Sequence, residues 1–156
     1  MPPSGGGPVV SPYGPLAEFQ DRILSGVIDF LAPWIVGYIL QLFSGAFVPF
    51  SGDRGGLYFV GSGVQLLGVA WALYNGYLAG QTGQSIGMKQ SNLRLVGENT
   101  GQPIGGGQGV LRNLIWVVGG CCCGILVLVD ALFPLWDPKK QTLRDKVAKS
   151  VVVKLG

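Results

Sequence analysis

Asp29 is the residue whose position most strongly indicates chemistry, because it is the only charge within residues 23–50. A charged side chain at membrane depth costs about 2.5 kcal/mol or more, so it requires an ionic partner, a water-filled cavity or a bound proton. Arg22 lies seven residues earlier, close to two turns of an α-helix, and is the first expected partner on the same face. Asp29 is therefore our first candidate functional residue.

Pro33 is the second informative residue of this stretch. It has no amide hydrogen, so the carbonyl oxygen of Asp29 loses its usual helical donor. We expect a kink or a polar pocket there, and an ion pathway could use both the carboxylate of Asp29 and the carbonyl freed by Pro33. Membrane helices also tolerate proline without functional consequence, and the sequence leaves both interpretations open.

The composition indicates the class of protein. Of the 156 residues, 12% are charged and 48% are hydrophobic, whereas about a quarter of the residues of a soluble domain are charged. We interpret the chain as an integral membrane protein whose principal partner is the lipid bilayer. A leader rich in proline and glycine, residues 1–17, is predicted to be disordered, and residues 18–154 form one membrane domain.

The predicted fold is an all-α membrane protein with two long transmembrane helices, in residues 23–50 and 57–79, and a third apolar segment, residues 113–136. The third segment either spans once or bends back as a re-entrant hairpin. A single span would place four basic residues on one side and seven on the other, whereas a re-entrant segment would place ten against one. Because cytoplasmic loops are rich in Lys and Arg, we favour the second arrangement, with the polar loop and the tail both cytoplasmic.

The polar loop between the second and third segments predicts a small β-hairpin, with strands in residues 92–96 and 102–104 around a turn. Residues 151–155 are rich in valine and could add a third strand. In the third apolar segment, Asp130 lies less than two turns before Trp136, so we expect it to reach the membrane interface.

Small residues recur at four-residue spacing on the second predicted helix and let another backbone approach closely. The members of this small-residue face are Gly68, Ala72, Gly76 and Gly80. The sequence leaves open whether this face packs on the first helix or on a second copy of the chain.

Several functional classes are disfavoured. The chain has no histidine, and Cys121, Cys122 and Cys123 are consecutive, so they point in different directions on a helix and cannot together surround a metal ion. We therefore expect no metal, no cofactor and no enzymatic activity. Six of the eleven basic residues follow Trp136, which indicates attraction to anionic lipid, whereas nucleic-acid binding is disfavoured because no aromatic residues accompany these charges.

Three motifs occur in order along the chain: Arg22 to Asp29 at the first helix, GQSIGMKQSNLRLV at residues 83–96, and DPKKQTLRDKVAKSVVVK at residues 137–154. Together they resemble the RDD family of small bacterial membrane proteins, named for one arginine and two aspartates. The resemblance implies a charged network of Arg22, Asp29 and Asp145 in a multi-pass protein of the bacterial plasma membrane. The implied loop positions are Gly83, Gly87, Lys89, Arg94 and Arg112.

The chain departs from the usual family pattern at the end of the third motif. Arg144 stands where the family usually has histidine, and Lys149 where it usually has glycine. The function that the sequence favours is an accessory or structural role in a larger membrane assembly. The alternative is an oligomeric transporter of a small ligand, for example a cation/proton exchanger that uses Asp29.

Overall fold

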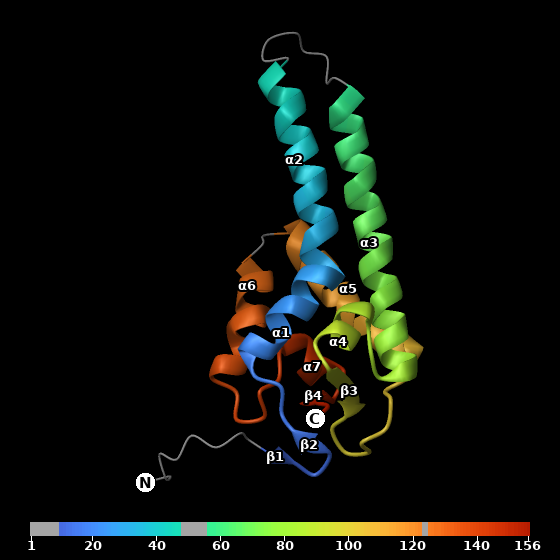
Figure 1. Cartoon of the computed structure of the whole chain (residues 1–156), viewed down its shortest axis with the longest axis vertical. Coiled ribbons are helices and arrows are strands. Elements are labelled where there is room, and N and C mark those ends of the chain that lie inside the picture. Colours follow the sequence, from blue (N-terminus) through green and yellow to red (C-terminus); the bar gives the residue numbers. More distant parts are fainter. Residues whose placement is uncertain (1–9, 48–55, 123–124) are drawn as a thin grey trace.

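The computed structural model describes residues 10–47, 56–122 and 125–156. A long helical hairpin projects from a base in which shorter helices and strands gather, and the C-terminus lies at that base (Figure 1). The hairpin consists of α2 (Ala32–Phe47) and α3 (Gly56–Thr82), and α1 (Phe19–Gly26) leads into α2 through a π-helical turn, η1 (Val27–Leu31).

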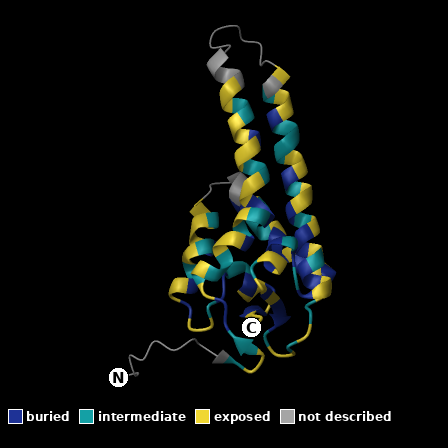
Figure 2. Cartoon of the chain, viewed as in Figure 1, coloured by how far each residue is buried: buried dark blue, intermediate teal, exposed yellow. Residues whose placement is uncertain are grey.

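One helix among the described residues, Phe19–Phe43, is long and apolar enough to cross a membrane: it has 25 residues, and an 18-residue window within it has a mean hydropathy of 1.9. Of the two predicted transmembrane helices, the first thus meets this criterion among the described residues, and the second is not confirmed. α3 is also long, at 27 residues, but glycines and polar side chains make it less apolar. Figure 2 shows that exposed and half-buried residues dominate the projecting part of the hairpin, whereas the buried residues gather toward the base.

The third apolar segment is bent. It forms α5 (Gly106–Cys122) and α6 (Ile125–Leu132), which pack against each other and are followed by a 3₁₀ turn, η2 (Phe133–Leu135). A Cβ placed on Gly119 would lie 3.2 Å from the Cβ of Leu126, so the two helices approach closely. Of our two alternatives for residues 113–136, the straight single span is wrong. We expected that the side chains of Cys121, Cys122 and Cys123 do not surround a metal ion together; these side chains lie outside the part of the chain that the structure describes.

The base is built on an antiparallel pair of strands, β3 (Leu93–Gly97) and β4 (Ser150–Lys154). The partner of β3 is thus the C-terminal tail, and the predicted hairpin within the loop is wrong, because residues 102–104 form no strand. The loop instead turns back to the end of β3, where the amide of Gly97 donates to the carbonyl oxygen of Gln102 at 2.8 Å. The pairing places the polar loop and the tail at the same end of the molecule.

The leader is ordered over its last part, so the predicted boundary at residue 17 is too late. β1 (Val10–Ser11) and β2 (Gly14–Pro15) form a short hairpin, and Leu16 bridges to Val153 of β4. Leu16 and Ala17 are buried, and the amide of Ala17 donates to the carbonyl oxygen of Val152 at 2.8 Å. The prediction of disorder for residues 1–9 falls outside the described residues.

Two short helices lie just before the strands β3 and β4, and each begins at a capping residue. α4 (Ile86–Gln90) starts at Ser85, whose hydroxyl accepts the amide of Met88. α7 (Leu143–Val147) starts at Thr142, which forms a reciprocal capping box with Asp145. Such caps satisfy amides that have no partner within the helix, so these residue types fix where each helix begins.

The small-residue face of α3 packs within the same chain. A Cβ on Gly68 would lie 2.8 Å from the Cβ of Pro33 on α2, and one on Gly76 would lie 2.5 Å from the carbonyl oxygen of Gly109 on α5. Ala72 is fully buried, and Gly80 lies directly against Gly105. The sequence did not decide the partner of this small-residue face, and the structure shows that it packs against both α2 and α5.

Candidate functional site: two buried carboxylates between the helices and the tail

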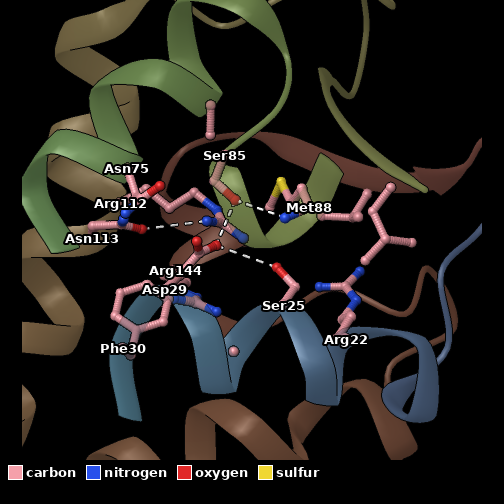
Figure 3. A pocket seen from close by; sticks show the side chains of 14 residues that line it. Arg22, Ser25, Asp29, Phe30, Asn75, Ser85, Met88, Arg112, Asn113 and Arg144 are labelled. Carbon is pink, nitrogen blue, oxygen red and sulfur yellow. Dashed lines mark hydrogen bonds between the residues drawn. The ribbon is translucent and has the colours of Figure 1, made fainter. Parts of the chain in front are cut away.

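Asp29 lies in the π-helical turn and is bound by uncharged donors. Its carboxylate accepts the hydroxyls of Ser25, at 3.3 Å, and of Ser85 (Figure 3). It also accepts the amide of Gly87 at 2.8 Å. The residue is only 2% exposed. The hydroxyl of Ser85 and the amide of Gly87 come from the cap and the first turn of α4, so Asp29 joins the first helix to the loop that follows α3.

Gly87 allows this contact. A Cβ at this position would lie 2.6 Å from the carbonyl oxygen of Ser25 and 2.8 Å from Oδ1 of Asp29. Real side chains do not tolerate such distances, so only glycine permits α4 to approach α1 this closely. Among the predicted loop positions, Gly87 thus has a clear steric reason for its identity.

The expected ion pair between Arg22 and Asp29 is wrong. Seven residues return to the same helix face but also rise about 10 Å along the axis, which is beyond direct contact. Arg22 instead donates through Nη1 to Oδ2 of Asp145, at 2.6 Å, and through Nη2 to the carbonyl oxygen of Lys140. The arginine of the first helix therefore holds the C-terminal tail.

Asp145 is the centre of a buried charge network. Its side chain has 0% exposure and receives two guanidinium groups, Nη1 of Arg22 on Oδ2 and Nε of Arg112 on Oδ1, each at 2.6 Å. Oδ2 also accepts the amide of Thr142 at 3.1 Å. Asp145 thus ties α1, α5 and α7 together with charge-assisted hydrogen bonds, which are about twice as strong as neutral ones.

The electrostatics of Asp145 favour its charged form. Burial raises the pKa of a carboxyl, but Arg112, Arg22 and Arg144 outweigh this effect and hold the pKa of Asp145 far below its usual range. A carboxylate held this way remains ionised at every physiological pH. Its network is therefore a permanent one.

Arg144 and Asp130 form a second buried pair. Nε of Arg144 lies 3.3 Å from Oδ2 of Asp130, and the backbone amide of Arg144 donates to Oδ1 at 2.9 Å. Asp130 is only 2% exposed, so its carboxylate is bound inside the protein; its position at the membrane interface stays a prediction. The tail that folds back over α6 supplies the partner, which the local sequence around Asp130 does not reveal.

The guanidinium of Arg144 also lies over two aromatic rings, 4.8 Å from the centre of Phe30 and 5.3 Å from that of Trp116. Burial is the main factor that lowers the pKa of Arg144 to about 10, and Arg112 adds to it. The protein thus compensates this cation only in part. Within the described part of the chain, Nε and Nη1 of Arg144 have no aligned hydrogen-bond partner.

A small cavity of about 20 Å³ lies between these groups. Its lining includes Asp29, Asn75 and the three arginines 22, 112 and 144 (Figure 3). A cavity needs roughly 10–15 Å³ to hold one water molecule, so this one fits a single water with polar partners on its walls. Pro33 does not line it, and the structure therefore does not bring Asp29 and Pro33 together in one pathway.

The predicted kink before Pro33 takes the form of the π-helical turn. The amide of Ala32 donates to the carbonyl oxygen of Val27, five residues earlier. The carbonyl oxygen of Ile28 is thereby left without its α-helical donor, and the indole of Trp71 on α3 supplies one at 3.2 Å. Such π-turns recur at functional sites, and here the turn also directs Asp29 toward α4.

The remaining loop positions are separated from the two carboxylates. Lys89 and Arg94 are exposed, and Gly83 adopts a positive φ of 82° where α3 ends. Lys149, at the position where the family usually has glycine, holds a φ of 47°, a conformation that costs a side chain about 1–2 kcal/mol. No group of three or more potential metal ligands occurs among residues 10–47, 56–122 and 125–156.

Sequence reasoning missed the uncharged partners of Asp29. Ser85 is the N-cap of α4, and serine is a residue type preferred at that position, so this signal could have placed a hydroxyl near the loop glycine. Asn75 accepts the amide of Ile86 at 3.0 Å, and Asn113 donates to the carbonyl oxygen of Ala72 at 2.7 Å. Both asparagines lie on apolar helices, where a polar side chain indicates an interhelical contact.

A long apolar helix, a bent helical pair and a tail fastened by buried ion pairs define a helical membrane-type protein. The chain belongs to the RDD family, whose model matches residues 16–149. The resemblance drawn from the three motifs is thus confirmed over most of the chain.

Two named relatives are similar over a shorter region. The "Proline-rich antigen homolog" of Mycobacterium tuberculosis, in strains CDC 1551 / Oshkosh and H37Rv, is 44% identical over 87 residues, 55% of this chain and 35% of the relative. The "Proline-rich antigen" of Mycobacterium leprae strain TN is 44% identical over 89 residues, 55% of this chain and 33% of the relative. The match thus spans about a third of each relative's length. No solved structure matches the chain significantly.

Proposed function

We propose that this protein is a non-catalytic accessory or structural component of a larger membrane assembly. The observation that carries the proposal is the pairing of Asp145: its fully buried carboxylate binds the guanidinium groups of Arg22 and Arg112. A transport site must be wet and must exchange what it binds, whereas a buried pair of this kind loses several kcal/mol if one partner leaves. The network is suited to holding the tail on the helices.

The surroundings of Asp29 support the same proposal. Its oxygen atoms already accept three donors, and the adjoining cavity of about 20 Å³ admits one water rather than a hydrated cation. Asp29 therefore acts as a junction between the first helix and α4. Its burial cost is offset by hydrogen bonds, as buried carboxylates require.

We further propose a multi-pass arrangement in the bacterial plasma membrane, with α2 and α3 as a helical hairpin and with loop and tail on the cytoplasmic side. The pairing of β3 with β4 supports a shared side for loop and tail. The concentration of basic residues after Trp136 supports the cytoplasmic side. Exposed apolar side chains along α2, such as Ile35, Ile39 and Leu42, would then contact lipid or a neighbouring subunit.

The accessory role is tested by purification from native membranes in a mild detergent, followed by native mass spectrometry. We expect the wild type to leave the membrane in a complex of fixed stoichiometry with a different membrane protein. Asp145→Asn should release that partner, because it frees the tail, while Lys89→Gln, which removes an exposed charge of the loop, should retain it. A wild type that is found only as copies of itself contradicts the accessory role.

A second candidate function is an oligomeric transporter that exchanges a cation for a proton at Asp29. One observation favours it: among the described residues, Asp29 is a buried carboxylate without an ion pair, in a π-helical turn. Reconstitution in liposomes separates the two functions. Proton-coupled cation flux that is present in the wild type and absent in folded Asp29→Asn supports exchange, whereas flux equal in the two proteins excludes it.

A further inference from the structure

Two adjoining apolar hollows form one groove along the side of the molecule. The first, of about 210 Å³, lies between α2 and the α5–α6 pair, and the second, of about 200 Å³, lies between α1 and α6. Leu31 and Trp116 line both hollows, so they are continuous. We call this combined feature the lateral groove. Its walls are almost entirely apolar in the first hollow, as an acyl chain requires.

The lateral groove ends at basic side chains. Arg22 and Arg144 line the second hollow together with Thr142, whereas the first hollow is lined by apolar side chains and two tryptophans. All three hydrogen-bonded guanidinium contacts of Arg22 go to protein oxygens, so Arg22 offers charge but few free donors. Arg144 differs: its Nε lies 3.3 Å from Oδ2 of Asp130, but its Nη1 and the indole Nε1 of Trp116 are buried without hydrogen-bond partners among the described residues.

Unpartnered donors, and not a net charge, mark this end of the groove. The three arginines 22, 112 and 144 lie beside three carboxylates, Asp29, Asp130 and Asp145, so the charges of the cluster balance. Nη1 of Arg144 and Nε1 of Trp116 nevertheless have no acceptor among the described residues. The oxygen atoms of a phosphate at the groove end would supply such acceptors.

We propose that the lateral groove binds one anionic phospholipid, with an acyl chain in the apolar hollow and the phosphate against Arg144. Both requirements of such a ligand are met on one surface, because the apolar groove runs directly to Arg144, whose Nη1 has no acceptor among the described residues. The site goes beyond the accessory role proposed above and does not depend on it. It predicts that the protein prefers an anionic headgroup over a zwitterionic one of the same chain length.

Trp116 provides the probe, because it lines the groove at the junction of its two hollows. A variant with Trp34, Trp71 and Trp136 replaced by phenylalanine reports on Trp116 alone; because Trp34 also lines the first hollow, this variant is the reference protein for every substitution below. It is reconstituted in phosphatidylcholine vesicles that contain increasing fractions of brominated phosphatidylglycerol or brominated phosphatidylcholine, whose bromines quench tryptophan on contact. We expect about fivefold stronger association of the anionic lipid, the contribution of one basic residue near an anionic lipid.

Two variants with matched controls locate the lipid. Arg144→Gln should reduce the preference for phosphatidylglycerol to near one, while Lys89→Gln, at an exposed basic residue outside the groove, should leave it unchanged. Ala131→Phe fills the second hollow and should weaken quenching by both lipids, while Ile39→Phe on the exposed face of α2 should not. Because Ala131→Phe leaves every charge in place, it tests the groove even if Arg144→Gln fails to fold.

Equal association of both lipids with the wild-type groove would overturn the proposal, because it would show annular lipid without headgroup recognition. Quenching in Ala131→Phe that matches Ile39→Phe would overturn it as well, because the chain would then lie elsewhere. A retained preference in folded Arg144→Gln would assign the headgroup to another cation and contradict the role of Arg144.

Discussion

The substitution Gly87→Ala is the sharpest test of how the first helix is joined to the loop. The added methyl group would meet the carbonyl oxygen of Ser25 at 2.6 Å and Oδ1 of Asp29 at 2.8 Å, so α4 must move away. Overpacking costs typically 1–3 kcal/mol, and losing a hydrogen bond to a charged group costs about 1.5–3 kcal/mol. Since these effects overlap, we expect a net loss of about 2–4 kcal/mol of unfolding free energy.

The assay is equilibrium unfolding of the purified protein in mixed detergent micelles, with Gly63→Ala on α3 as the matched control. Gly63 has open space around its Cβ position, so alanine there should stabilise the helix by about 0.5–1 kcal/mol. Combining Gly87→Ala with Asp29→Ala should reduce the added cost, because one of the two clashing groups is gone. A Gly87→Ala protein as stable as Gly63→Ala would refute the close contact of α4 with α1.

Three further predictions concern the charge network, the π-turn and the topology. Because the pKa of Asp145 is lowered in the folded state, its contribution to stability is complete above the unfolded pKa of about 3.9 and is lost as the pH falls toward the folded value. The free energy of unfolding of the wild type should thus fall more steeply below pH of about 4 than that of Asp145→Asn, and parallel curves would contradict this. Trp71→Phe removes the donor to the carbonyl of Ile28 and should cost about 1 kcal/mol, whereas Tyr74→Phe should change stability by less than about 0.5 kcal/mol; equal costs would exclude the contact. Single cysteines at positions 89 and 146, in a chain without Cys121 to Cys123, should be labelled from the same side of the membrane, and labelling from opposite sides would contradict the pairing of β3 with β4.

Local patterns predicted the elements of this fold better than their partners. The long first helix, the bend of the third segment and the valine-rich terminal strand are all visible in the sequence. The pairing of β3 with β4 was offered only as an addition to a local hairpin, because residues 102–104 are nearer in sequence than residues 150–154. Strand pairing depends on long-range packing, which a local pattern does not contain.

The charged residues illustrate the same limit at the site. The membership of Arg22, Asp29 and Asp145 in one region came from the family resemblance, but the pairing of Arg22 with Asp29 was taken from helical periodicity and was wrong. Periodicity reports the face of a helix and ignores the axial rise between residues seven apart. Two partners of Asp29, the residues Ser85 and Gly87, lie more than fifty residues away, so the sequence around Asp29 does not identify them.

Substitutions relative to the family pattern have local explanations in the structure. Arg144, in place of histidine, reaches across Phe30 and Trp116 to pair with Asp130. Lys149, in place of glycine, bears the cost of a positive φ at the end of α7, just before β4 begins. The first change adds a buried cation beside the lateral groove, and this is the cation that the proposed lipid site uses.

A double-mutant cycle between Arg112 and Asp145 tests most directly whether the buried network holds the fold together. The four proteins are the wild type, Arg112→Gln, Asp145→Asn and the double variant, compared by equilibrium unfolding in mixed micelles. The 2.6 Å contact between two buried groups predicts a coupling energy of about 2–3 kcal/mol, at the upper end for contacting residues. A coupling within about 0.5 kcal/mol of zero would contradict a permanent structural role for Asp145.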